Sequence, residues 1–131
     1  MIDKEIIKIA SNTENHGKLD NHTHFSKLKN AICGDEMKVY IMVENDKVIN
    51  FKYECESCIY CQASVSLLST NSINKSTESL VNLIKIVDTF FDEENIKFSN
   101  EWSFIKKLFK KENLSRKECL KLPFNALSKA L

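Results

Sequence analysis

The sequence predicts an α+β fold, with a small antiparallel sheet of about three strands covered on one face by helices. Two observations support this prediction. Hydrophobic residues alternate with a period of two over residues 36–53, and helical spacing begins at Cys58 and continues toward the C-terminus. Strands therefore come first and helices last. The length of 131 residues and the hydrophobic fraction of 43% are typical of one globular domain, residues 1–131.

The N-terminal third predicts three short segments. Residues 2–12 have apolar side chains at helical spacing, so we expect a short helix there. Residues 12–21 are polar and predict a loop. The pattern of residues 24–32 is ambiguous, and a strand is one interpretation.

A β-hairpin is the clearest local prediction. Two alternating runs flank the dipeptide Asn45-Asp46, which is a typical two-residue hairpin turn. The side chains expected on the buried face are Met37, Val39, Ile41 and Val43 in the first run, and Ile49, Phe51, Tyr53 and Cys55 in the second.

Several helices are predicted after this hairpin. Residues 58–68 are rich in small side chains, which suits a helix packed closely against its neighbours. Ser76 is a candidate N-cap for the next helix. The buried stripe expected on that helix is Leu80, Leu83, Ile84, Val87, Phe90 and Phe91.

The C-terminal helices are predicted from similar signals. One begins near Asn100 and has an apolar face formed by Trp102, Ile105, Leu108 and Phe109. Ser115 and Glu118 have the spacing of a capping box. Pro123 is suited to the first turn of a final helix that ends at Leu131.

Composition excludes several classes of function. The formal net charge of +1 argues against a dedicated nucleic-acid binder, which would show a basic excess. Two glycines are too few for a glycine-rich phosphate-binding loop. The longest apolar run, residues 39–43, is too short to span a membrane, and the first residues show no apolar leader. We therefore expect a cytoplasmic protein in a reducing compartment, where cysteines serve as metal ligands or reactive groups.

The five cysteines allow three interpretations. A free cysteine is often a small buried apolar residue, which fits Cys55 and Cys61. Alternatively, Cys55, Cys58 and Cys61 form two overlapping C-x-x-C pairs, as in redox sites or part of an iron–sulfur ligand run. The third interpretation joins Cys33, Cys58 and Cys119 with the carboxylate of Asp35 as four ligands of a soft metal. Periodicity alone does not show that these four converge.

Three motifs resemble the NifU N-terminal domain family, the IscU/SufU-type iron–sulfur cluster assembly scaffolds. They are Cys33-Gly34-Asp35, the segment of residues 57–66 around Cys58, and the segment of residues 116–124 around Cys119. Residues 15–20 are also similar to an early loop of the family. The resemblance covers essentially the whole chain and implies a SufE/NifU-like fold. The long interval between Cys58 and Cys119 is closer to the SufU-like form.

The resemblance implies a ligand set and a chemistry. Cys33, Asp35, Cys58 and Cys119 would bind a transient 2Fe-2S type cluster or zinc. Cys33, Cys119 and Cys58 are the candidate persulfide acceptors, and no catalytic residue is assigned. The implied partners are a cysteine desulfurase and iron–sulfur acceptor proteins, with no nucleic acid or membrane, and the chain would be a monomer or weak dimer.

The chain departs from the family pattern at three places. Two glycines expected before Cys58 are replaced by Cys55 and Ser57, which would be strained if those positions required positive φ. Glu118 replaces the histidine of the IscU-like form, and the histidines at 16, 22 and 24 match no ligand position. Arg116 matches a family arginine, where it would neutralise a thiolate or lie in solvent as a surface residue.

The function expected from these residues is that of an assembly factor rather than an enzyme. It would accept sulfur from a desulfurase and hold a cluster or zinc, with persulfide transfer as its one catalysis-like step. A zinc-dependent sulfurtransferase partner of a desulfurase is an alternative. A metal-free interaction module with structural or redox cysteines is another, and Asp35 distinguishes it because neither role needs that carboxylate.

Overall fold

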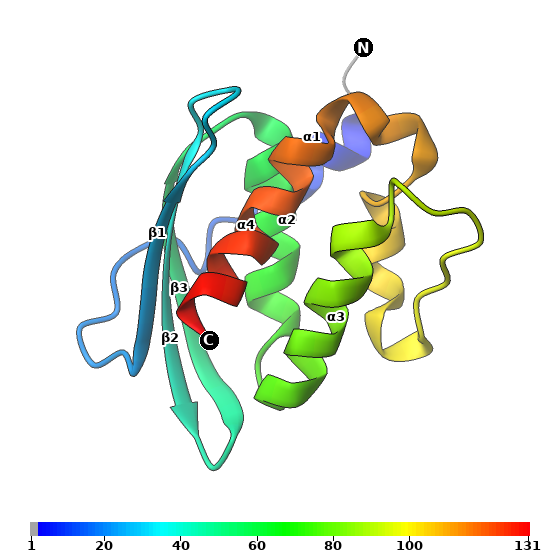
Figure 1. Ribbon diagram of the computed structural model, residues 1–131. Coiled ribbons are helices and arrows are strands. Elements are labelled where there is room, and N and C mark those ends of the chain that lie inside the picture. Colours follow the sequence, from blue (N-terminus) through cyan, green and yellow to red (C-terminus); the bar gives the residue numbers. More distant parts are fainter. Residues whose placement is uncertain (1–2) are drawn as a thin grey trace.

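The computed structural model describes residues 3–131 and confirms the α+β fold (Figure 1). An antiparallel sheet has the strand order β1–β2–β3, with β1 at His24–Lys29, β2 at Glu36–Glu44 and β3 at Lys47–Glu56. The ambiguous segment is therefore a strand, shorter than the range considered from the sequence. The predicted helix of residues 2–12 is confirmed in part, because Ile2 lies outside the described residues.

Helices cover one face of this sheet. The helices are α1 (Lys4–Ala10), α2 (Ile59–Asn71), α3 (Thr77–Thr89) and α4 (Lys117–Ala130), with two 3₁₀ segments, η1 (Asn100–Lys107) and η2 (Lys111–Arg116). In Figure 1, α2 and α4 lie directly over the sheet; α2 contacts β3, and α4 contacts β1 and β2. Helix α1 packs on α2, and α3 packs on α4. No helix in the described part of the chain is long and apolar enough to cross a membrane.

The hairpin forms as predicted, with one correction to its buried face. Asn45 and Asp46 both have positive φ, 51° and 62°, which is the backbone of a type I′ turn. A bulge between Met42 and Val43 shifts the register, so that Val48 rather than Ile49 points into the core. The prediction for Ile49 was wrong because a bulge interrupts strict alternation, and its side chain is 40% exposed.

Helix α2 lies at the centre of the helical layer, and its small residues explain why. Ser64 and Ser66 are buried, and each donates its hydroxyl to a backbone carbonyl of another element. Ser64 bonds the Leu120 carbonyl of α4 at 2.6 Å, and Ser66 bonds the Asn12 carbonyl after α1 at 2.9 Å. Small side chains thus let α1 and α4 approach α2 closely, as the sequence predicted.

Helix α3 also matches its prediction. The Ser76 hydroxyl accepts a hydrogen bond from the Ser79 N–H at 3.1 Å and so caps the helix. The expected stripe is buried from Leu80 to Phe90, while Phe91 is half-buried. The helix predicted near Asn100 is a 3₁₀ segment with a kink at Trp102.

Two predictions about α4 were wrong. The helix begins at Lys117 with Arg116 as its N-cap, and the N-cap makes no side-chain cap hydrogen bond, so Ser115 does not form the expected capping box. Pro123 lies inside the helix instead of in its first turn. Proline lacks an N–H, so the Cys119 carbonyl four residues earlier receives no hydrogen bond from that position.

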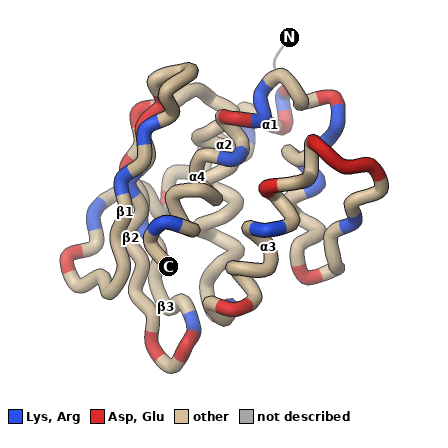
Figure 2. The backbone as a smooth tube through the Cα atoms, in the orientation of Figure 1, with Lys and Arg blue, Asp and Glu red and all other residues tan. Residues whose placement is uncertain are grey.

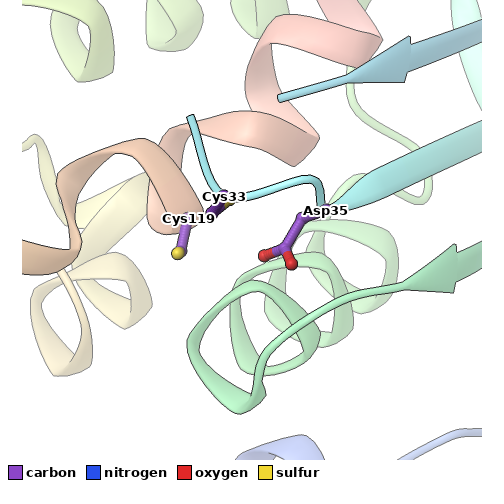
Figure 3. Close-up of side chains that lie close together, drawn as sticks. All are labelled: Cys33, Asp35 and Cys119. Atoms are coloured by element: carbon purple, nitrogen blue, oxygen red, sulfur yellow. The ribbon is translucent and has the colours of Figure 1, made fainter. Parts of the chain in front are cut away.

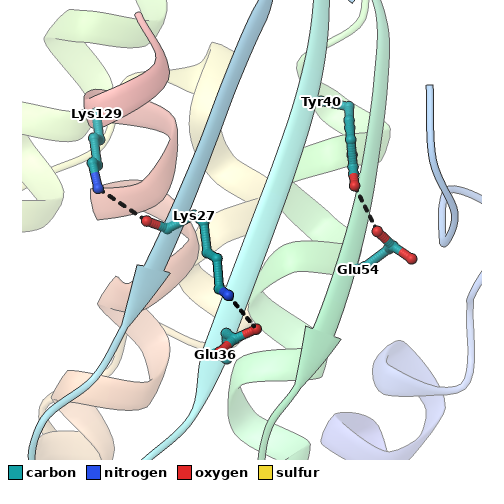
Figure 4. Close-up of polar contacts among 5 residues, drawn as sticks. All are labelled: Lys27, Glu36, Tyr40, Glu54 and Lys129. Atoms are coloured by element: carbon teal, nitrogen blue, oxygen red, sulfur yellow. Dashed lines mark hydrogen bonds and ion pairs between the residues drawn. The ribbon is translucent and has the colours of Figure 1, made fainter. Parts of the chain in front are cut away.

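The outer face of the sheet carries polar and aromatic side chains (Figure 4). The Tyr40 hydroxyl donates to Glu54 at 2.6 Å, and this bond raises the pKa of Tyr40 to about 12. Lys129 of α4 donates to the Lys27 carbonyl of β1 at 3.0 Å, which ties the end of α4 to the sheet edge. Basic and acidic residues are interspersed along the elements (Figure 2), in line with the near-neutral net charge.

We expect Ser64→Ala to lower the free energy of unfolding by about 1–3 kcal/mol, because a buried carbonyl loses a donor at a tight helix contact. Ser115→Ala is the matched control and should change it by less than about 0.5 kcal/mol, since Ser115 is exposed. Urea unfolding measures both. A loss of about 1 kcal/mol at Ser115 would instead indicate a working cap.

Candidate functional site

Cys33 and Asp35 lie in the loop between β1 and β2, which Asn30 holds in shape. The Asn30 N–H donates to the Asp35 carbonyl at 2.8 Å, and the Asn30 carbonyl accepts from the Gly34 N–H at 2.8 Å. The Asn30 side chain accepts a third bond from the Ile32 N–H at 2.8 Å. This network fixes the loop from within, so Cys33 is exposed yet has a defined position.

Gly34 allows the turn between the two candidate ligands. Its φ is +77°, which L-residues rarely adopt, and no heavy atom lies within 4 Å of where a Cβ would be. The requirement for glycine is therefore conformational rather than steric. The turn directs Cys33 and Asp35 toward the starts of two helices.

Asp35 lies at the N-terminus of α2. Its Oδ2 accepts a hydrogen bond from the Cys58 N–H at 3.3 Å, and Cys58 is the N-cap residue of α2. A carboxylate is favoured there because the first N–H groups of a helix have no intrahelical acceptor and carry positive partial charge. Cys58 therefore lies where α2 begins.

Cys119 approaches from the first turn of α4 and is buried, with 7% of its surface exposed. The Cys33 sulfur, an Asp35 carboxylate oxygen and the Cys119 sulfur all lie within 4.8 Å of one another. Figure 3 shows the three side chains together, two from the β1–β2 loop and one from α4. Residues far apart in the sequence are thus brought to one point.

Cys58 lies next to this group without belonging to it. Its thiol lies near the Cys119 thiol and helps to raise the pKa of that group, and its backbone N–H donates to Asp35. Of the four residues predicted as ligands, the structure groups Cys33, Asp35 and Cys119 and places Cys58 beside them.

The electrostatics of the site favour a bound cation. Burial raises the pKa of the Cys119 thiol, and the neighbouring Cys58, Cys33 and Asp35 raise it further. Three thiols and a carboxylate in contact repel one another once they are ionised. A positive ion among them would remove this repulsion and stabilise the thiolates.

The donors present suit a soft divalent metal. Zinc binds thiolate at about 2.3 Å and carboxylate at about 2.0–2.2 Å, so ligands of one tetrahedral ion lie about 3.5–4 Å apart. The three grouped atoms lie within 4.8 Å of one another, which leaves only small side-chain movements to reach that geometry. Iron is equally suited to thiolate ligands.

Cys55 and Cys61 lie near the site but outside the group of candidate ligands. Cys55 is half-buried on β3, and Cys61 is fully buried in the first turn of α2. Burial raises the pKa of both thiols, while the Ser57 hydroxyl between them lowers it. This environment fits the interpretation of Cys61 as a core residue, whereas Cys55 is only partly buried.

The replaced glycines cause no backbone strain. Neither Cys55 nor Ser57 is among the described residues with positive φ, and β3 continues in extended conformation to Glu56. The backbone before Cys58 therefore has a conformation that residues other than glycine adopt without strain. Both remaining glycines do have positive φ, 139° at Gly17 and 77° at Gly34.

The histidines and Arg116 lie elsewhere. The His16 ring packs on Tyr53, and the His22 ring packs on Phe25 and Tyr40. The Arg116 guanidinium lies over the Tyr60 ring at 5.1 Å from its centroid. The metal-ligand cluster found in residues 3–131 consists of Cys33, Asp35 and Cys119.

The role of Asn30 in the loop was not predicted from the sequence. An asparagine whose side chain accepts from the N–H two residues later is typical of an Asx turn, and that signal was present in Asn30-Ala31-Ile32. The role of Ser57 had no sequence signal, because it depends on the contact between β3 and α2.

Comparison with known proteins identifies related sequences. The family model described as NifU-like N terminal domain matches residues 1–98, which include Cys33, Asp35 and Cys58. A Thermotoga maritima protein named iron–sulfur cluster assembly scaffold protein IscU is 32% identical over 136 residues, covering 100% of this chain and 92% of the relative. An uncharacterized protein of Borreliella burgdorferi is 28% identical over 136 residues, with 99% and 82% covered.

Solved structures show the same fold. A candidate iron–sulfur cluster assembly scaffold for the SUF system from Fervidobacterium islandicum superposes with a TM-score of 0.89 at 25% identity, covering 98% of this chain and 95% of that one. The N-terminal part of a NifU-like protein from Brucella abortus gives 0.88 at 21% identity, covering 98% and 90%. On the match over residues 1–98 and the full-length relative at 32% identity, this chain belongs to the NifU-like N-terminal domain family.

Proposed function

We propose that this protein is an iron–sulfur cluster assembly scaffold. The observation that carries the proposal is the convergence of Cys33, Asp35 and Cys119 within 4.8 Å, beside Cys58. The name of the Thermotoga maritima relative supports it. The proposal treats residues 1–131 as one domain, because one hydrophobic core joins side chains from the sheet and from all four α-helices.

The proposed ligands are Cys33, Asp35, Cys58 and Cys119. Three thiolates hold iron or zinc firmly, whereas a carboxylate is a harder and more readily exchanged ligand. Cys58 would complete the set by a rotation about its side-chain bonds, since it lies near enough to Cys119 to raise the pKa of that thiol. A mixed ligand set of this kind would hold the metal or cluster through its thiolates and allow its release through exchange of the carboxylate.

Sulfur acceptance follows from the accessibility of the thiols. Cys33 is exposed and Cys58 is half-buried, so a sulfur donor reaches these two before the buried Cys119. Attack by one of these thiolates on the persulfide of a cysteine desulfurase would transfer sulfane sulfur to the scaffold. Acceptor proteins would then take the finished cluster. We propose that these exchanges occur in the cytoplasm and that this protein acts as a monomer or weak dimer.

We expect each of Cys33→Ser, Asp35→Asn, Cys58→Ser and Cys119→Ser to reduce bound iron and acid-labile sulfide after anaerobic reconstitution. Each variant removes one donor of the proposed set. Metal and sulfide analysis per chain measures the effect. Cys55→Ser is the matched control, a half-buried thiol outside the set, and should retain the wild-type content.

The result also separates two functions. Wild-type protein that binds zinc and accepts sulfur but never holds iron with sulfide would be the zinc-dependent sulfurtransferase of the alternative hypothesis. Loss of metal in Cys55→Ser but not in Cys119→Ser would contradict the ligand set. A wild-type chain that binds neither metal would contradict the proposal altogether.

Zinc should raise the melting temperature of the wild-type chain. A ligand that binds only the folded state stabilises it by about 2.7 kcal/mol at a concentration of 100 times its Kd. Thermal unfolding followed by circular dichroism, with zinc and then with excess chelator, measures the shift. Asp35→Asn keeps an acceptor for the Cys58 N–H but loses the charge, so its shift should be smaller; an equal shift would remove Asp35 from the ligand set.

A further inference from the structure

A pair of cysteines occupies the first turn of α2. Cys58 is the N-cap residue and Cys61 is the third helical residue. Side chains at these two positions face each other, which is why they form the reciprocal contacts of a capping box. Here the Cys58 side chain makes no cap hydrogen bond, and Asp35 accepts from its N–H instead. The Cys58 sulfur is therefore not used to cap the helix.

The two thiols differ in what can reach them. Cys58 is half-buried and adjoins the Cys33–Asp35–Cys119 group, whereas Cys61 has 0% of its surface exposed. A sulfur donor therefore meets Cys58 and not Cys61. The buried Cys61 sulfur can react only with a group of the protein that lies next to it. Cys58 is such a group, because residues three apart on a helix have Cβ atoms about 5–6 Å apart.

Ser57 gives Cys61 a partner suited to a thiolate. Its hydroxyl is buried and has no hydrogen-bond partner of good geometry in the described part of the chain. Burial raises the pKa of the Cys61 thiol, and the nearby Ser57 hydroxyl offsets part of that rise. A hydroxyl without another acceptor can donate to that sulfur when it reacts.

We propose that Cys61 is a resolving thiol that releases sulfide from a persulfide on Cys58. The inference rests on the sulfur acceptance proposed above and adds a second step to it. The site would then receive sulfide, which is the form of sulfur found in clusters. The two cysteines supply the electrons for this step, so no external reductant is needed until the thiols are restored.

The reaction balances within the chain. The Cys61 sulfur attacks the Cys58 sulfur, a Cys58–Cys61 disulfide bond forms, and the bond from Cys58 to the sulfane sulfur breaks. The electron pair of that bond leaves with the sulfane sulfur as hydrosulfide, and the proton of the Cys61 thiol goes to it or to solvent. The sulfane sulfur is reduced by two electrons while the two cysteine sulfurs are oxidised. A dithiol reductant restores both thiols by exchange.

Cys55 provides a matched comparison. It also lies beside Ser57, but it is on β3 and lines two surface pockets, so soluble reagents reach it directly. A chain with Cys55 and Cys58 therefore has the same number of neighbouring thiols as a chain with Cys58 and Cys61. Only Cys58 and Cys61 occupy the N-cap and third positions of a helix, where side chains face each other.

The experiment uses the full chain carrying Cys33→Ser and Cys119→Ser, free of metal and under anaerobic conditions. One variant adds Cys55→Ala and keeps Cys58 with Cys61; the matched variant adds Cys61→Ala and keeps Cys58 with Cys55. Each is loaded with inorganic polysulfide and desalted. Released sulfide is measured, remaining persulfide is alkylated, and disulfides are mapped by mass spectrometry.

We expect the chain with Cys61 to release one sulfide per persulfide and to form the Cys58–Cys61 disulfide. The chain without Cys61 should keep its persulfide and release sulfide about tenfold more slowly or worse. Equal release from both variants, or a stable persulfide beside Cys61, would overturn the inference. Disulfide mapping of the loaded wild-type chain is independent of any substitution, and absence of a Cys58–Cys61 link there would overturn it as well.

The two proposals fail in different ways. If the loaded wild-type chain carries sulfane sulfur but its Cys58 persulfide stays intact, sulfur acceptance stands and the resolving role of Cys61 is wrong. If neither the wild-type chain nor the variants take up sulfur, the sulfur-accepting function and the inference both fail.

Discussion

The site depends on the hydrogen bond from the Cys58 N–H to the Asp35 carboxylate. The pairing of Glu36 with Glu56 brings the β1–β2 loop near the start of α2, and this bond joins the two directly. It also satisfies a helix N–H that lacks an intrahelical acceptor, and it places negative charge at the positive end of α2. A carboxylate has two oxygens with several lone pairs, so Asp35 can keep this bond and still offer a ligand atom to the group with Cys33 and Cys119. A single residue thus positions the loop and supplies a ligand atom.

The third partner, Cys119, reaches the site because α4 packs closely on α2. The buried Ser64 hydroxyl bonds the carbonyl of Leu120, the residue directly after Cys119, and so fixes the first turn of α4 against α2. A larger side chain at that position would separate the helices and move the Cys119 sulfur away from Asp35. The placement of the ligand is therefore a consequence of core packing. Pro123 adds a local feature, since it leaves the Cys119 carbonyl without its usual helical donor.

The sequence predicted those features that depend on neighbouring residues. The hairpin around Asn45-Asp46 and the capped helix after Ser76 follow from local alternation, turn chemistry and capping, and both are confirmed. The bulge beside Ile49 was not predictable, because the register of β3 depends on its pairing with β2. Spacing alone could not bring Cys33, Asp35 and Cys119 together, since their meeting depends on the contact of α2 with α4; the family resemblance supplied that information. Asn30 was predictable from its Asx-turn spacing, whereas the contact of Ser57 with Cys61 was not.

The loss of two glycines before Cys58 changes the surroundings of the site without distorting it. The extended backbone of β3 through Glu56 accepts a side chain at position 55, and Ser57 and Cys55 both lie near enough to Cys61 to affect its pKa. The result is a buried hydroxyl and two thiols directly behind a candidate ligand. Exposure then separates the roles of the cysteines: Cys33 meets solvent, Cys58 lies at the boundary, and Cys61 contacts only the protein interior. Chemistry that begins at an exposed sulfur can therefore end at a buried one, Cys61, which soluble thiols do not reach.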